Sequence, residues 1–124
     1  MKKWTEAGGS YQFPFMGAAT RSLKGEVQIK CPKCDGGPLR AYFHMFKPAV
    51  GTGTIWVWCP QCRTTTHLSR VTPQAELGPD PFADLTIDQF EALERGKEPL
   101  LDRLDRMWTE GKIKPATNSG TESH

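Results

Sequence analysis

The sequence predicts an α+β fold in which a small antiparallel sheet is followed by a two-helix hairpin toward the C-terminus. Two runs, residues 39–46 and 54–59, are rich in the aromatic and β-branched residues typical of strands. Apolar residues recur at helical spacing over residues 100–108. Two Cys-x-x-Cys pairs flank the strand runs, and a chain of 124 residues with 37% hydrophobic content suits one small domain whose core needs added support.

Residues 1–25 predict an irregular N-terminal segment. Four glycines and Pro14 interrupt this stretch, and its aromatic residues are too few for a core of their own. The alternating aromatic residues of segment 11–15 suit one short extended piece, which Pro14 would confine to a sheet edge or to a partner's groove. Residues 27–29 are a candidate strand that leads into the first cysteine pair.

The central sheet is predicted to have three main strands. Residues 51–53 supply turn residues between the runs 39–46 and 54–59, which are therefore expected to form a hairpin. Residues 64–70 contain several threonines and add a third strand.

Both faces of this sheet are apolar. Because strand side chains alternate, Trp56 and Trp58 lie on one face, while Ile55 and Val57 lie on the other. We expect the C-terminal helices to cover one face, which leaves the N-terminal aromatic residues or another protein to cover the second.

Residues 72–83 contain three prolines and predict a linker, and residues 84–111 predict an acidic helical hairpin. Thr86 is the expected N-cap of the first helix, with Gln89 completing a capping box. Gly96 is expected to end that helix.

The second helix is predicted to start with Pro99 in its first turn and to close at Gly111. Its apolar stripe includes Leu104 and Trp108, and its other side is charged. The remaining residues, 112–124, are polar and are expected to form a disordered tail.

The four cysteines predict one metal site. Cys31, Cys34, Cys59 and Cys62 form two Cys-x-x-Cys pairs separated by 24 residues that contain the predicted hairpin. Zn²⁺ binds four thiolates tetrahedrally, and the hairpin would return the second pair to the first. Four thiolates close the coordination sphere, so we expect a structural zinc ion and no enzymatic activity.

The pattern Cys-Pro-x-Cys, a strand pair, then Cys-Pro-x-Cys and another strand resembles the zinc ribbon with rubredoxin-like knuckles. The likeness covers residues 27–70 of the unit predicted over residues 26–71, and the four cysteines match the family's ligand positions. Asp35 and Arg63 replace the glycine that is usual after the second ligand of each pair. The resemblance implies a structural metal, with iron as the alternative to zinc.

Other interpretations of these residues fit less well. A redox Cys-Pro-x-Cys of the glutaredoxin kind opens a helix, whereas both pairs here are flanked by predicted strands. A zinc deaminase needs His-x-Glu, and neither His44 nor His67 is followed by a glutamate at that spacing. Both histidines are expected to be hydrogen-bonded core or rim residues.

The charge distribution leaves two classes of partner open. Residues 1–72 carry ten Lys and Arg against three acidic residues, whereas residues 73–111 carry four against ten. Basic residues interleaved with aromatic ones on the sheet are typical of nucleic-acid binding, while the acidic helices would repel phosphates and favour a basic protein. The candidate partner-binding residues are Tyr42, Trp56, Trp58, Asp102, Asp105 and Trp108.

A second resemblance favours a protein partner. The run from Gly53 to Cys59 and the segment Leu101-Asp102-x-Leu104-Asp105-x-x-Trp108 are similar to small zinc-ribbon proteins of bacterial polymorphic-toxin loci, which act as immunity proteins. We therefore expect a cytoplasmic, non-catalytic zinc-ribbon binding protein, an immunity-type inhibitor or adaptor that binds a partner such as a bacterial toxin. The alternative is a nucleic-acid-binding zinc ribbon or transcription accessory factor.

Overall fold

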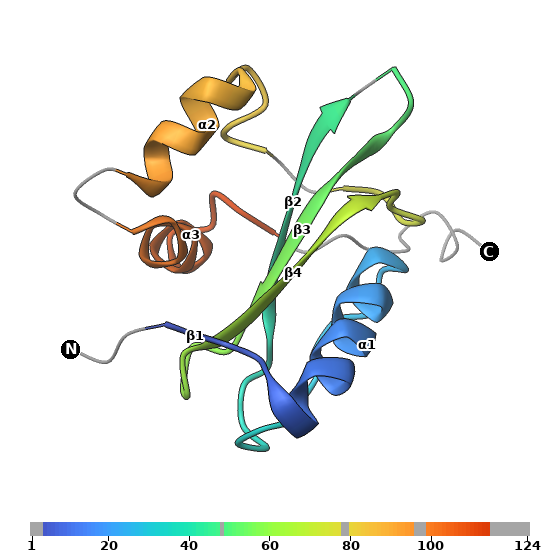
Figure 1. Ribbon diagram of the computed structural model, residues 1–124, viewed down its shortest axis with the longest axis vertical. Coiled ribbons are helices and arrows are strands. Elements are labelled where there is room, and N and C mark those ends of the chain that lie inside the picture. Colours follow the sequence, from blue (N-terminus) through green and yellow to red (C-terminus); the bar gives the residue numbers. More distant parts are fainter. Residues whose placement is uncertain (1–3, 48, 78–79, 96–98, 115–124) are drawn as a thin grey trace.

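The structure, a computed structural model, describes residues 4–47, 49–77, 80–95 and 99–114. In chain order its elements are β1 (Thr5–Glu6), a 3₁₀ turn (Gly9–Tyr11), α1 (Gln12–Leu23), β2 (Arg40–Lys47), β3 (Thr52–Trp58), β4 (Thr64–Val71), α2 (Ile87–Glu94) and α3 (Leu100–Thr109). The sheet lies between α1 on one side and α2 and α3 on the other (Figure 1). The α+β class is thus confirmed, although a helix also lies between β1 and the other three strands of the described sheet.

The described strands form one sheet in the order β1-β4-β3-β2. The predicted hairpin is confirmed as the antiparallel pair of β2 and β3, with Tyr42 opposite Trp56, and β4 pairs antiparallel on the other side, with His67 opposite Trp56. The prediction of a purely antiparallel sheet is wrong, because β1 runs parallel to β4 with Thr5 opposite Thr64.

The prediction that residues 1–25 are irregular is wrong, because α1 spans Gln12–Leu23. Pro14 falls in the first turn of α1, where a backbone N–H has no partner within the helix, so the proline does not disrupt it. Gly17 has open space around it. The predicted strand at 27–29 is also absent, since Gln28 adopts a left-handed conformation with φ 59°.

Helix α1 covers the face of the sheet that carries Ile55 and Val57. Its buried residues include Phe15 and Ala19, which recur at helical spacing and have no exposed surface. This first core contains Ala7, Phe15, Ala18, Ala19, Leu23, Ile29, Cys31, Leu39, Phe43, Ile55, Val57 and Cys59. The chain itself therefore covers the second face of the sheet, through α1.

Helices α2 and α3 cover the face that carries Trp56 and Trp58. The Phe90 ring of α2 stacks on Trp56 with 5.3 Å between the ring centroids. This second core contains Tyr42, Trp56, Trp58, Phe82, Phe90, Leu100, Leu104, Met107 and Ile113. The apolar stripe predicted for the second helix is thus buried against the sheet, as expected.

The predicted signals at the helix ends are confirmed at Thr86 and Gly111, whereas Pro99 is the N-cap residue of α3 and not part of its first turn. The capping box joins Thr86 and Gln89 at the start of α2. At the end of α3, Gly111 has φ 79°, and the N–H groups of Gly111 and Lys112 donate to the carbonyl groups of Trp108 and Met107. Gly96 and the connection between the two helices lie outside the described residues, as do residues 115–124 of the predicted tail. The prediction of a disordered tail from residue 112 is wrong at its start, because Ile113 is buried in the second core.

The segment predicted as a linker, residues 72–83, contacts the layers that pack on the two faces of the sheet. Gln74 N–H donates to the Leu23 carbonyl at the end of α1 over 2.8 Å, and Phe82 is buried in the second core. In the described part of the chain, no helix is both long enough and apolar enough to cross a membrane.

Candidate metal centre

Two tight turns carry the four cysteines. In each turn, the residue after the second cysteine donates its backbone N–H to the carbonyl of the first cysteine, from Asp35 to Cys31 over 2.9 Å and from Arg63 to Cys59 over 3.0 Å. The second turn joins β3 to β4, and Cys59 N–H donates to the Thr64 carbonyl over 2.9 Å. The sheet therefore fixes the position of the second pair of cysteines.

Both turns require a left-handed residue, and neither uses glycine. Asp35 has φ 59° and Arg63 has φ 56°. For a residue with a side chain this conformation costs about 1–2 kcal/mol, less for aspartate, whose short polar side chain tolerates it. Asp35 and Arg63, which stand where the zinc-ribbon pattern usually has glycine, therefore still adopt the left-handed conformation, and the two turns have equivalent geometry.

The four sulfur atoms lie within 4.8 Å of one another. Cys31 Sγ is 3.7 Å from Cys62 Sγ, and Cys34 Sγ is 3.6 Å from Cys59 Sγ. Sulfurs placed tetrahedrally at about 2.3 Å from a zinc ion would be about 3.8 Å apart. The four cysteines predicted as ligands are therefore brought together, and their spacing fits a four-coordinate metal ion.

The surroundings of the thiols also suit a cation. Burial raises the pKa of the Cys31 thiol and raises that of Cys59 to about 12. Burial also opposes ionisation of Cys62, but the Thr64 hydroxyl and the neighbouring thiols outweigh it and lower the pKa of Cys62 to about 7. Buried thiols of this kind are held as thiolates most readily by a metal ion, whose charge compensates theirs.

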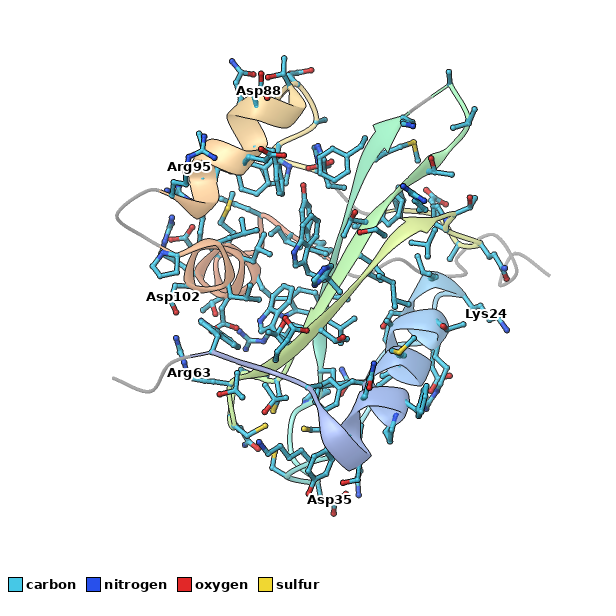
Figure 2. All side chains as sticks on the ribbon, in the orientation of Figure 1. Lys24, Asp35, Arg63, Asp88, Arg95 and Asp102 are labelled. Carbon is cyan, nitrogen blue, oxygen red and sulfur yellow. The ribbon has the colours of Figure 1, made fainter. Side chains whose placement is uncertain are left out.

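A group of side chains ties the second cysteine turn to α3 and to the N-terminal segment. The Arg63 guanidinium lies over the Trp4 ring, 4.2 Å from its centroid, and forms an ion pair with Asp102. The same carboxylate accepts a hydrogen bond from Trp4 Nε1–H over 2.8 Å. Figure 2 shows Arg63 and Asp102 near each other beside α3.

Asp105, one turn along α3, makes an equivalent connection. Its Oδ1 accepts hydrogen bonds from Trp58 Nε1–H over 2.8 Å and from Arg40 Nη1–H over 2.7 Å. Asp102 and Asp105, predicted to bind a partner, are thus engaged within the chain and hold α3 against the sheet.

The aromatic residues predicted to bind a partner lie mainly in the second core. Trp58 has no exposed surface, and Tyr42 and Trp56 are also buried. Trp108 is half-buried and packs edge-on against Trp58, with 6.2 Å between the ring centroids. The structure therefore brings these four residues together as packing side chains, with only Trp108 partly accessible.

The sequence patterns do not predict the polar cluster that Asp80 forms with Tyr42 and His44. The Asp80 carboxylate accepts a hydrogen bond from the Tyr42 hydroxyl and lies 3.0 Å from His44 Nδ1. Burial opposes ionisation of Asp80, but His44, Tyr42 and the Phe82 N–H outweigh it and lower its pKa. Burial and the nearby Asp80 carboxylate raise the pKa of Tyr42 far above its usual value. Asp80 lies between two prolines of the predicted linker, and no local pattern there indicates a partner two strands away.

Comparisons with known proteins give no relative for the chain. No family model matches it, and no curated protein or solved structure matches it at a significant level. The metal centre and the surfaces around it must therefore be interpreted from their own chemistry.

Proposed function

We propose that the four cysteines hold one structural Zn²⁺ in a zinc-ribbon site. The observation that carries this proposal is the spacing of the sulfurs, 3.6–3.7 Å for the two close pairs. Four thiolates leave no open coordination position for a substrate or an activated water. Cys31 and Cys59 belong to the first core, so the ion would link the two cysteine turns to the packing of α1 on the sheet.

Iron is the alternative metal, because a tetrahedral set of four thiolates suits either ion. Colour distinguishes them: Zn²⁺ has a filled d shell, so its thiolate site is colourless, whereas ferric iron in the same site absorbs visible light. The purified protein is expected to be colourless and to contain zinc.

For the chain as a whole we propose a non-catalytic binding role, that of an immunity-type inhibitor or adaptor for another protein such as a bacterial toxin. The internal pairing of two basic residues of the sheet and its turns supports a protein partner over nucleic acid. Arg40 and Arg63 are paired with Asp105 and Asp102, and Trp56 and Trp58 are buried beneath the helices. A surface that binds single-stranded nucleic acid needs free cations and exposed rings on which bases stack.

Two binding measurements test this proposal. Calorimetry of the zinc-loaded chain with the product of the neighbouring gene is expected to give a stoichiometric complex that suppresses the partner's activity. Fluorescence anisotropy with a labelled single-stranded oligonucleotide is expected to show no binding. Oligonucleotide binding that weakens steeply with salt, without any protein complex, would establish the nucleic-acid alternative instead.

A further inference from the structure

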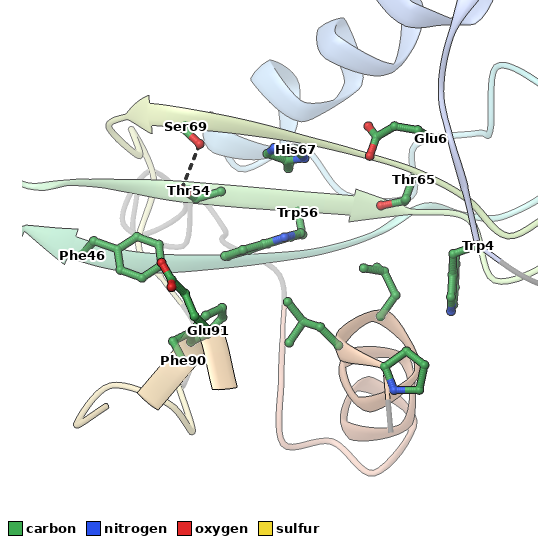
Figure 3. A pocket seen from close by; sticks show the side chains of 13 residues that line it. Trp4, Glu6, Phe46, Thr54, Trp56, Thr65, His67, Ser69, Phe90 and Glu91 are labelled. Atoms are coloured by element: carbon green, nitrogen blue, oxygen red, sulfur yellow. Dashed lines mark hydrogen bonds between the residues drawn. The ribbon is translucent and has the colours of Figure 1, made fainter. Parts of the chain in front are cut away.

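An open groove of about 510 Å³ lies between the sheet and the helices α2 and α3. The helices cover the β2 and β3 part of the second core, and the groove extends from Trp56 out to Thr65 and His67 on β4. Figure 3 shows Phe46 and Phe90 at one end and Trp4 at the other. A groove of this volume accommodates several side chains of a bound segment.

The groove opens beside an incompletely paired strand edge. Because Cys59 N–H bonds to the Thr64 carbonyl, alternate residues of β4 direct their backbone groups away from β3, and these are Thr65, His67 and Ser69. The Thr65 carbonyl accepts from Ala7 N–H over 2.8 Å, where β1 ends. For the outward backbone groups of His67 and Ser69, the described residues provide no partner.

The chemistry of the groove favours a cation. Glu6 and Glu91 are exposed carboxylates on its rim, and the half-buried rings of Trp4 and Phe46 contribute aromatic surface. The lining residues include no lysine or arginine. A Lys or Arg side chain beside aromatic rings and a carboxylate gains cation–π and ion-pair attraction together.

We propose that an extended, basic segment of the partner protein adds as a strand to the outer edge of β4, over residues 66–69, and places Lys or Arg and apolar side chains in this groove. The inference rests on the proposed protein-binding function and specifies where and how the partner binds. Strand addition satisfies the outward N–H and C=O groups of His67 and Ser69, and the groove selects the side chains that alternate with them. A second copy of the chain fits less well, because pairing β4 with β4 would bring two acidic grooves together.

The test uses two pools of nine-residue peptides and the full zinc-loaded chain. In one pool Lys or Arg alternates with Val or Leu, and in the other Asp or Glu replaces the basic residues. The basic pool is expected to bind at least tenfold more tightly. Equal binding, or no binding by the basic pool, would overturn the inference.

Charge reversal locates the site. Glu6→Lys and Glu91→Lys change exposed side chains of the groove and are expected to weaken binding of the basic pool about tenfold each. Asp84→Lys is the matched control, since Asp84 is exposed and lies outside the groove lining, and it is expected to leave the affinity unchanged. Equal losses in all three variants would show a general charge effect and overturn the proposed site.

Amide hydrogen exchange measured by NMR distinguishes strand addition from other binding modes. The His67 and Ser69 amides, which point outward, are expected to exchange at least tenfold more slowly when the basic pool is bound. The Thr66 and Leu68 amides point to β3 and serve as internal controls that are protected in both states. Unchanged exchange at His67 and Ser69, or protection that appears with self-association of the chain, would overturn the inference.

The two proposals fail in different ways. A partner protein that binds tightly while the His67 and Ser69 amides stay unprotected would refute the β4 site and leave the binding function standing. An oligonucleotide that binds where no protein does would refute the function itself, and the β4 site with it.

Discussion

Replacement of Asp105 by alanine tests how α3 is held against the sheet. Its carboxylate accepts hydrogen bonds from Trp58 over 2.8 Å and from Arg40 over 2.7 Å. Trp58 is fully buried, so its indole N–H would lose its acceptor at a cost of about 1–3 kcal/mol. The Arg40 pair is a quarter exposed on both sides and adds less than about 1 kcal/mol. We expect Asp105→Ala to lower the free energy of unfolding by about 2–3 kcal/mol.

Urea unfolding of the zinc-loaded protein, followed by circular dichroism, measures this loss. Asp105→Asn keeps an acceptor for Trp58 and is expected to cost less than about 1 kcal/mol, because it loses only the charge opposite Arg40. Asp84→Ala, at an exposed position, is the control and is expected to change stability by less than about 0.5 kcal/mol. If Asp105→Ala matched Asp84→Ala, or matched Asp105→Asn, the hydrogen bond to Trp58 would not be what holds the helix.

Three further predictions concern the backbone and the buried tyrosine. Gly17→Ala should stabilise the protein by about 0.5–1 kcal/mol in urea unfolding, because Gly17 lies in the middle of α1 with open space around it. Gly53→Ala should lower the free energy of unfolding by more than about 2 kcal/mol, because its added Cβ would lie 2.0 Å from the His44 carbonyl oxygen. Asp35→Gly should be stable to at least the wild-type level, and Asp35→Val should be less stable than Asp35→Gly by about 1–2 kcal/mol, measured by thermal unfolding. The pKa of Tyr42 is raised in the folded state, so folding favours the neutral phenol. The stability that Tyr42 contributes is therefore complete below the pKa of an unfolded tyrosine, about 10. Above that pH the free energy of unfolding is expected to fall by about 1.4 kcal/mol for each pH unit. Tyr42→Phe should remove this part of the alkaline loss, as seen in urea midpoints between pH 9 and 11.

Each of these predictions has an outcome that contradicts its reasoning. A destabilising Gly17→Ala would argue against the helix at residues 12–23, and a neutral Gly53→Ala against the close approach of β2 and β3. Equal stability of the two Asp35 variants would refute the left-handed turn. Parallel alkaline profiles for the wild type and Tyr42→Phe would show that Tyr42 is not buried beside Asp80.

The elements with strong local signals could be predicted from the sequence. Aromatic and β-branched runs identified the three main strands, and the alternation of Trp56 and Trp58 with their neighbours correctly assigned the two faces of the sheet. The capping box at Thr86 and the glycine at position 111 located helix ends because both act within one turn of backbone. The cysteine spacing identified the cluster because a hairpin connects the two pairs.

The parts that were missed depend on context that local patterns do not carry. Pro14 and Gly17 are ordinarily signs of irregular chain, yet Pro14 lies in the first turn of α1 and Gly17 lies in open space, so neither prevents the helix. The buried spacing of Phe15, Ala18 and Ala19 was the signal that could have revealed it. The partners of Asp102 and Asp105 lie far away in the sequence, so local patterns assign these acidic residues to an exposed helix surface. In the structure both carboxylates instead accept hydrogen bonds from tryptophan side chains of the same chain.

The central claim, that one four-thiolate zinc ion organises the molecule, is tested most directly by native mass spectrometry with elemental analysis of the purified chain. We expect one zinc per chain, and its loss in Cys59→Ser together with the collapse of the circular dichroism spectrum. A protein that carries no metal and keeps the same spectrum and melting temperature in a strong chelator would contradict the account.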